Sequence, residues 1–186
     1  MHKNTYWYVF FLLLSVFLIF SNGRFGGDGL ENYLTTESIV LDRDLSIHDR
    51  AFTVKEMHSE SRGVIGKDGK LYSAYGIGMP ILLIPLYLSG HFISQWFKPE
   101  LHDYIANFSV SLINPIFIAF SAVVLLGLLI ELGYKLRVAI WSVMIYAFST
   151  MILIYIRSGF SDPALTLCYL LAALAVFKFN RSKNKI

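Results

Sequence analysis

Residues 5–33 read TYWYVFFLLLSVFLIFSNGRFGGDGLENY. The first part, Thr5–Phe20, carries no charge and is just long enough to cross a membrane with its flanks. The second part, Gly23–Tyr33, places Asp28 between glycines, which adopt backbone conformations closed to other residues and allow a ligand to approach closely. The sequence therefore predicts a membrane helix that presents a carboxylate at its mouth.

Two interpretations of Asp28 remain open at this point. A carboxylate at the mouth of a span can act as a general base, a metal ligand or a counter-charge beside a phosphate. An aspartate in a Gly-Asp-Gly turn can equally cap that turn, or the helix expected from about Leu30. The apolar run before it is interpreted as an uncleaved span rather than a signal peptide, because it is rich in bulky aromatics and Ser21–Phe25 lacks a small-x-small cleavage site.

The composition is that of an integral membrane protein. Of the 186 residues, 55% are hydrophobic and 16% are aromatic, and the mean hydropathy is +0.56, values typical of several membrane spans. The net charge of +3 is small and scattered, which argues against a nucleic-acid partner. The single cysteine, Cys168, excludes an internal disulfide framework, and the five histidines lack the close spacing of zinc ligands.

The topology follows from the basic residues. After the polar segment 22–78, apolar stretches occupy 79–97, 104–130, 138–156 and 163–179. If the first of them crossed the membrane, the loop with Lys135 and Arg137 and the basic tail 180–186 would face outward, against the positive-inside rule. If it lies in the membrane interface instead, both fall inside.

We therefore predict an all-α integral membrane fold with about four transmembrane helices, an extracytoplasmic first loop over 22–78 and an interfacial helix. The spans are expected at 5–21, 104–130, 138–156 and 163–179, and the interfacial helix at 79–97. Both chain ends are expected on the cytoplasmic side of a cell membrane.

Within the outer loop, three local features are predicted. Leu30–Val40 shows helical spacing of its apolar residues. Asp42 and Asp44 flank an arginine and can bind a cation, although such a pattern more often forms a solvated turn. The glycines between Arg62 and Leu71 predict a loop or a hairpin.

The predicted topology brings four charged residues to one outer surface, Arg24 and Asp28 after the first span and Arg157 and Asp162 after the third. Ionisable side chains at span boundaries can serve as simple anchors, which is the stronger interpretation of Arg24. For Asp162 the alternative is a helix start, because Pro163 follows it. Their convergence predicts a polar cavity at the membrane surface.

Three motifs occur in order along the chain: Gly27-Asp28-Gly29 with Tyr33, then Asp68 to Gly78 running into Pro80 and Pro85, and finally Arg157-Ser158-Gly159-Phe160-Ser161-Asp162-Pro163. Together they resemble the integral membrane glycosyltransferases of the C-type fold, which include protein O-mannosyltransferases and the aminoarabinose transferases of lipid A. Members of that family use polyprenyl-phosphate sugar donors. In them the first outer loop carries an acidic catalytic residue, and the segment equivalent to Tyr75–Phe97 is interfacial.

The resemblance implies roles for individual residues. Asp28 would be the general base that takes the proton of the acceptor hydroxyl, and Asp162 would be the second acidic residue of the cavity. The substrate-binding candidates are Arg157, Arg24 and Lys70 for the departing phosphate, together with Tyr72, Tyr75 and Glu31. Some branches of the family use a divalent metal and others do not, so the cofactor is left open.

Members of this family are usually far longer than this chain. We therefore expect the N-terminal part of a longer protein, or one subunit of a split enzyme whose second membrane subunit completes the fold. The competing function is a non-catalytic membrane subunit, or a component that binds or flips the carrier lipid. A transporter is disfavoured, because the spans lack paired charges that would mark an ion path.

Overall fold

The computed structural model describes residues 3–26, 28–47 and 63–183. The chain divides into two compact units. The first unit consists of Met1–Ser21, Asn114–Arg157 and Ser161–Ile186, and the second of Asn22–Ile113 and Ser158–Phe160. The polypeptide thus leaves the first unit after Ser21, and the short segment Ser158–Phe160 returns to the second unit much later in the sequence.

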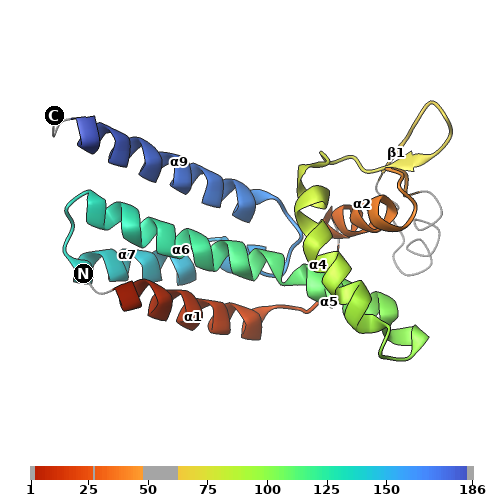
Figure 1. Cartoon of the computed structure of the whole chain (residues 1–186), viewed down its shortest axis with the longest axis horizontal. Coiled ribbons are helices and arrows are strands. Elements are labelled where there is room, and N and C mark those ends of the chain that lie inside the picture. The colour runs from red at the N-terminus through yellow and green to blue at the C-terminus, as the bar shows by residue number, and fades with distance from the viewer. Residues whose placement is uncertain (1–2, 27, 48–62, 184–186) are drawn as a thin grey trace. The chain divides into compact units, whose positions relative to one another are not determined.

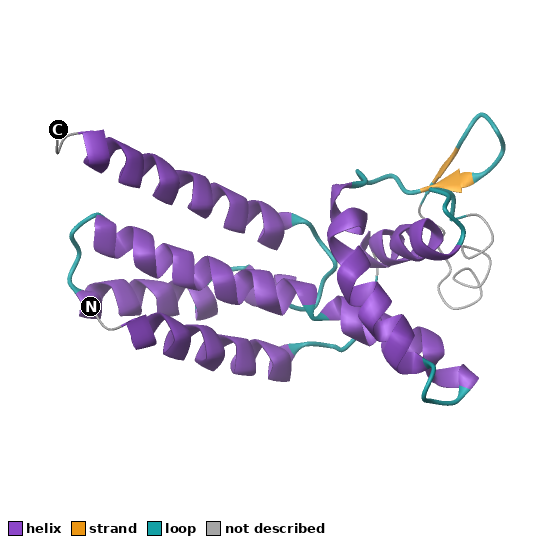
Figure 2. Ribbon diagram, in the orientation of Figure 1, coloured by secondary structure: helices purple, strands orange, loops and turns teal. Residues whose placement is uncertain are grey.

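The first unit is built from helices alone within the described residues (Figure 2). Its helices are α1 (Lys3–Phe20), α6 (Ile113–Glu131), α7 (Leu136–Phe148), α8 (Ile152–Tyr155) and α9 (Asp162–Lys183). The end of α6 shows how the sequence stops a helix: Gly133 has a φ of 90°, its amide donates to Ile130, and the amide of Tyr134 donates to Leu129. A glycine in the left-handed region with this pair of bonds closes the last helical turn.

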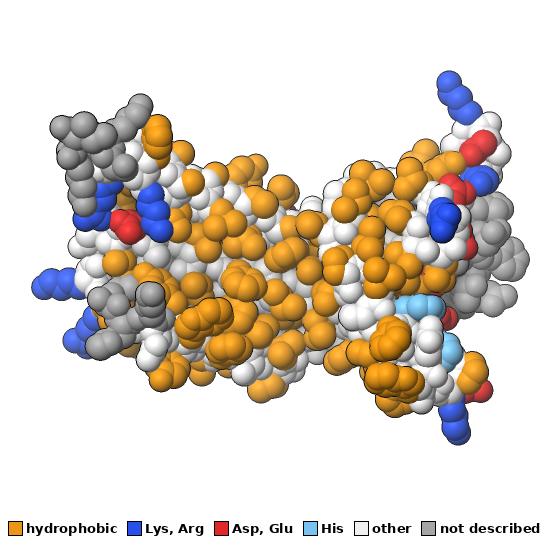
Figure 3. All heavy atoms as spheres, in the orientation of Figure 1, with side chains coloured by type: hydrophobic (Ala, Val, Ile, Leu, Met, Phe, Trp, Pro, Cys, Tyr) orange, Lys and Arg blue, Asp and Glu red, His pale blue; other side chains and the backbone are white. Residues whose placement is uncertain are grey.

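An apolar core holds α1, α6, α7 and α8 together. The fully buried side chains at its centre include Leu13 and Phe17 from α1, Ile118 and Leu126 from α6, and Val143 from α7. Buried alanines on α6 and α7 allow the helices to approach closely, as small residues do in membrane bundles. The opposite faces also carry large apolar side chains, and the side of this unit seen in Figure 3 is mostly apolar. Such extensive exposed apolar surface fits a lipid environment.

Three polar links join the helices of the first unit at their ends. Asn114 Nδ2 donates to the carbonyl of Tyr155 at 3.1 Å. Arg157 Nε donates to the carbonyl of Phe20 at 2.8 Å and so satisfies an orphan acceptor at the end of α1. Arg181 Nη1 lies 2.7 Å from Glu131 Oε2 and joins α9 to α6.

Among its described residues, the second unit combines three α-helices and a short 3-10 helix with a small hairpin. Its elements are α2 (Asp28–Leu41), β1 (Val64–Ile65), β2 (Leu71–Tyr72), α4 (Gly78–Ser94), the 3-10 helix η1 (Pro99–Leu101) and α5 (His102–Ser111). The strands pair antiparallel with Val64 opposite Tyr72, which confirms the hairpin expected from the glycine spacing. The chain after α2 joins them, because the amide of Ile47 donates to the carbonyl of Leu71 at 2.7 Å.

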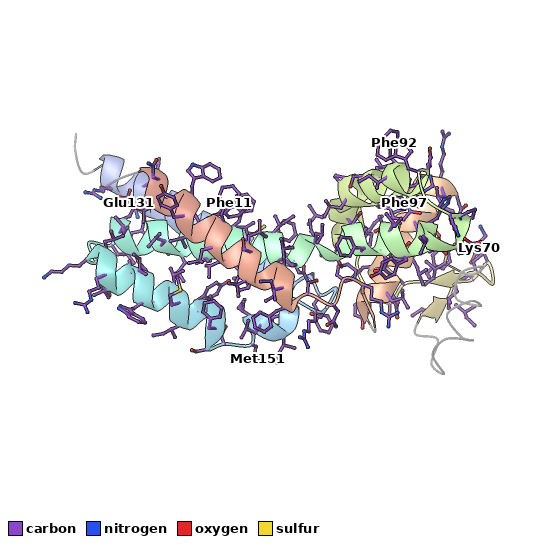
Figure 4. The ribbon with its side chains drawn as sticks, turned by 90° about the horizontal axis from the view of Figure 1, so that it is seen from below. Phe11, Lys70, Phe92, Phe97, Glu131 and Met151 are labelled. Carbon is purple, nitrogen blue, oxygen red and sulfur yellow. The ribbon has the colours of Figure 1, made fainter. Side chains whose placement is uncertain are left out.

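Small residues set the packing of α4 against α5. A Cβ added to Gly90 would lie 2.6 Å from Ser109 Oγ and 2.9 Å from Ala106 Cα, so α5 crosses α4 in direct contact with its backbone. Ala106, Ser109 and Val110 are buried in this contact. The aromatic side chains of Phe92 and Phe97, by contrast, are more than half exposed, and Phe92 points away from the ribbon in Figure 4.

The structure divides two of the predicted apolar runs. The run 104–130 is interrupted at Leu112, where α5 ends in the second unit and α6 begins. The run 138–156 breaks after Phe148, before the short helix α8. Hydropathy does not reveal these breaks, because the stretches on both sides of each break are mostly apolar.

The number of membrane spans stays a prediction. By length and composition, two helical stretches of the described chain could cross a membrane, Pro99–Glu131 and Asp162–Arg181. The apolar helices Asn4–Phe20, Gly78–Ser94 and Leu136–Phe148 are shorter. The fold class, a mostly helical membrane protein, agrees with the sequence prediction, while the count of four is not established by these lengths.

Candidate functional site

Helix α2 begins at Asp28, two residues before Leu30, where the sequence predicted its start. A carboxylate in the first turn of a helix interacts favourably with the helix dipole. Gly29 follows and is buried. The predicted base therefore occupies the first position of a helix whose next residue has no side chain.

Residues 31–38 of α2 are all buried, and most of them are polar. Six residues of this helix are at most 9% exposed although they are polar: Glu31, Asn32, Thr35, Thr36, Glu37 and Ser38. Thr36 Oγ1 lies 3.1 Å from the carbonyl of Pro80 on α4, and the hydroxyl of Tyr87 donates to Glu37 Oε1 at 3.2 Å. Buried polar groups are costly unless they are hydrogen-bonded. The hydroxyls of Thr35 and Thr36 also donate to carbonyls one turn earlier in α2, so much of this buried polarity is satisfied within the second unit.

Glu31 joins the segment after the hairpin to α2 through hydrogen bonds. Its Oε2 accepts hydrogen bonds from Ser73 Oγ at 3.1 Å and from the amide of Ala74 at 3.0 Å. Its Oε1 is buried and has no hydrogen-bond partner among the described residues. Glu31 thus has one oxygen engaged in structure and one acceptor left for another donor.

Asn32 joins α2 to the third sequence motif. Its Nδ2 donates to the carbonyl of Gly159 at 2.9 Å. A Cβ added to Gly29 would lie only 2.5 Å from the nitrogen of Gly159, so the two glycines are in direct backbone contact. The structure therefore sets the segment Ser158–Phe160 against the first turn of α2, within the second unit.

The hairpin holds Lys70 and Tyr72 in hydrogen bonds of its own. Lys70 Nζ lies 2.6 Å from Asp44 Oδ2, and the hydroxyl of Tyr72 donates to Asp68 Oδ2 at 2.6 Å. Figure 4 labels Lys70, which is exposed. A substrate phosphate that bound Lys70 would have to replace Asp44.

Charge and hydrogen bonding keep the pair of Lys70 and Asp44 ionised. The hydrogen bond from Lys70, followed by those from Ser46 and Leu45, holds the pKa of Asp44 well below its usual range, and Asp44 in turn raises the pKa of Lys70. A carboxyl with a lowered pKa contributes to stability above its unfolded pKa of about 4, and loses that contribution only as the pH falls further. The pair therefore persists at neutral pH. This agrees with the solvated-turn interpretation of Asp42 and Asp44.

Two more predicted residues of the second unit lie at its surface. Tyr75 is 43% exposed, and its amide donates to Ser73 Oγ at 3.1 Å. Arg24 is exposed in the connection between α1 and α2. Neither is buried in the apolar core, so both are accessible to a substrate.

Arg157 and Asp162 belong to the first unit. Arg157 is exposed and uses Nε to bond the carbonyl of Phe20. A guanidinium has five N–H donors in a fork, so this bond orients the group while leaving its outer edge for an anion. Asp162 is the first residue of α9 and is followed by Pro163, as expected of a helix start.

Sequence reasoning assigned no role to Asn32, Ser73 or Gly159, although each bonds a predicted site element. The sequence did contain one signal for Asn32. Asparagine is unfavourable in helix interiors, and a solvent-exposed helix position does not require it. The partners could not be found from the sequence, since Asn32 and Gly159 are 127 positions apart.

No group of three His, Cys, Asp or Glu side chains that could hold a metal ion occurs in the part of the chain that the structure describes. Metal dependence therefore stays open, as it was from the sequence.

Comparison with known proteins gives one match. A family model described as dolichyl-phosphate-mannose-protein mannosyltransferase matches residues 75–186, whereas neither the curated proteins nor the solved structures give a match. The matched range includes Tyr75, Arg157 and Asp162. The other predicted residues precede it: Arg24, Asp28, Glu31, Lys70 and Tyr72. Because the match covers more than half of the sequence, the chain belongs to the dolichyl-phosphate-mannose-protein mannosyltransferase family of membrane glycosyltransferases.

Proposed function

We propose that this chain forms an enzyme, or the N-terminal part or a subunit of one, that transfers a sugar from a polyprenyl-phosphate carrier to an acceptor hydroxyl with inversion at the anomeric carbon. The family match over residues 75–186 carries the proposal. Two buried polar residues of α2 support it, because Glu31 and Asn32 follow Asp28 within one helical turn and bond the two remaining sequence motifs.

In the proposed reaction, Asp28 takes the proton of the acceptor hydroxyl as its oxygen attacks the anomeric carbon. The bond from that carbon to the phosphate oxygen breaks, and polyprenyl phosphate departs with the electron pair. Because phosphate is already a good leaving group, the transfer requires a base but no general acid. A single in-line displacement of this kind inverts the configuration at carbon.

The departing phosphate needs positive charge. We assign this role first to Arg157, whose Nε bond to Phe20 orients the guanidinium. Arg24 is the second candidate, since it is exposed. Lys70 is the weakest of the three, because it already pairs with Asp44.

The remaining residues would contact the sugar or complete the site. The unpartnered Oε1 of Glu31 is suited to accept a hydrogen bond from a sugar hydroxyl. Tyr75 and Tyr72 offer aromatic rings on which a sugar can stack. Asp162 is proposed as the second acidic residue, from its place in the third motif.

We also propose that the N-terminus, the α6–α7 loop and the tail face the cytoplasm. The start of α1, the α6–α7 loop and the end of α9 lie at one end of the first unit in Figure 1, where Arg181 pairs with Glu131. Figure 3 shows Lys and Arg side chains gathered at that end. Such a distribution supports the positive-inside argument.

Labelling of single-cysteine variants is expected to show on which side of the membrane each position lies. In a Cys168→Ser background, the variants Asp28→Cys and Asp162→Cys should both react with a membrane-impermeant maleimide applied from outside the cell. Lys135→Cys, the matched control, should react only after the membrane is opened. Reaction of positions 28 and 162 from opposite sides would contradict the proposed topology.

Transfer itself is the direct test of the function. Proteoliposomes that contain the chain, supplied with a radiolabelled polyprenyl-phosphate sugar and an acceptor fraction from the same membranes, are expected to move label to the acceptor and to release polyprenyl phosphate. Product of the opposite anomeric configuration would support inversion. Saturable binding of the carrier without any transfer would favour the non-catalytic or carrier-binding alternative.

A further inference from the structure

Asn32 is almost completely buried, at 5% exposed, yet it contributes no apolar packing. Its Nδ2 donates to the carbonyl of Gly159 at 2.9 Å, while its Oδ1 is buried and has no partner among the described residues. Asparagine lowers the helix propensity, and burial of its amide costs free energy, so helix formation alone does not explain this residue. The bond to Gly159 is the reason that the geometry offers.

The contact around that bond is tight and made of backbone. Gly29, one turn before Asn32, touches Gly159 so closely that neither residue could carry a Cβ. The ring of Phe25 closes the other side, with Cδ2 3.0 Å from the Cβ position of Gly159. Phe25 is itself held by its amide, which donates to Asn107 Oδ1 at 2.7 Å. The segment Ser158–Phe160 is therefore confined against the first turn of α2.

We propose that Asn32 is a positioning residue for sugar transfer: by holding the carbonyl of Gly159, it fixes the segment Ser158–Phe160 against the turn that begins with Asp28. This role rests on the proposed function. Arg157 directly precedes the fixed segment, and Asp28 directly precedes Gly29. Without the donor, the carbonyl of Gly159 is left buried and unpaired, which favours displacement of the segment.

The test compares Asn32→Leu with a matched change on the same helix, both in the full chain. Asn32→Leu keeps the branched shape of the side chain but removes the donor, and kcat is expected to fall about 10–100-fold, because the reacting groups are misplaced. The KM for the polyprenyl-phosphate sugar should change less than about threefold, because the phosphate ligands themselves remain. Thr36→Val removes a buried hydroxyl that bonds the carbonyls of Asn32, at 2.7 Å, and of Pro80, at 3.1 Å, and it leaves the side-chain amide of Asn32 free to hold Gly159. It should lower thermal stability comparably while kcat stays within about threefold.

Hydrogen exchange gives a readout that does not depend on activity. The amides of 158–160 are expected to exchange faster in Asn32→Leu than in the wild type or in Thr36→Val. If Asn32→Leu does not fold, Asn32→Ser serves in its place, because it keeps a polar group too short to reach Gly159.

The two proposals fail in different ways. Unchanged kcat or unchanged exchange at 158–160, with a wild type that transfers sugar, overturns the role of Asn32 and leaves the proposed function standing. A wild type that transfers no sugar overturns the proposed function, and with it the role of Asn32 in transfer, even where exchange increases.

Discussion

Asp28→Asn is expected to lower kcat for sugar transfer by about 10²–10⁴-fold, the range that a general base contributes. The amide has nearly the same size as the carboxylate but cannot accept the proton of the acceptor hydroxyl. The KM for the polyprenyl-phosphate sugar should change little, because the base acts on the acceptor. Initial rates of transfer in proteoliposomes, measured against carrier-sugar concentration, check both values.

The matched control is Asp42→Asn, which makes the same chemical change at an exposed position just after the end of α2. It is expected to leave kcat within about twofold, because surface substitutions of this kind have small effects. Both variants should insert into membranes as the wild type does. Full activity of Asp28→Asn would show that Asp28 is not the general base, even though the chain belongs to this family.

Gly29→Ala is expected to destabilise the second unit by about 1–3 kcal/mol, the usual cost of overpacking. The direction of this change in the free energy of unfolding is informative, because alanine normally stabilises a helix interior by about 0.5–1 kcal/mol relative to glycine. At Gly29 the new Cβ would lie against the backbone nitrogen and Cα of Gly159, which cannot move aside as a flexible side chain can. Transfer should also fall, by about 10–100-fold, because the first turn of α2 must shift.

Gly78→Ala provides the comparison for this change. Gly78 is also in the first turn of a helix, α4, but a Cβ there meets no atom within 4 Å. It should be neutral or slightly stabilising. The thermal midpoint in detergent should therefore fall for Gly29→Ala, by about 4–8 °C for each kcal/mol lost, and hold or rise for Gly78→Ala. Equal midpoints for the two variants would show that the contact of Gly29 with Gly159 is not tight in solution.

Much of the local structure followed from sequence patterns, because those patterns act over a few residues. Apolar runs predicted the helices, and the spacing of Leu30–Val40 predicted α2 to within two residues at its start. Glycines after Arg62 predicted a loop or a hairpin, and the structure has the hairpin. The turn of Asp42 and Asp44 was also expected, although its partner Lys70 was not, because that ion pair joins residues 26 positions apart.

The candidate site was only partly predictable. Glu31 was named as a substrate-binding residue, yet the structure shows that one of its oxygens holds Ser73 and Ala74. Asn32 and Gly159 received no role, since their bond depends on the packing of two segments that the sequence keeps far apart. Hydrophobic periodicity could not reveal these contacts, because most of the buried residues of α2 are polar.

By itself, the sequence determined that the chain is a helical membrane protein and, through its motifs, which family it belongs to. Hydropathy and charge decide the first of these properties, because they reflect the transfer of side chains between water and lipid and require no knowledge of contacts. Only the tertiary structure decided that the run 104–130 is shared between two units, and that α2 buries the polar side chain of Asn32 against Gly159. Close backbone approach between Gly29 and Gly159 depends on the geometry of two distant segments, and such geometry exists only once the chain has packed.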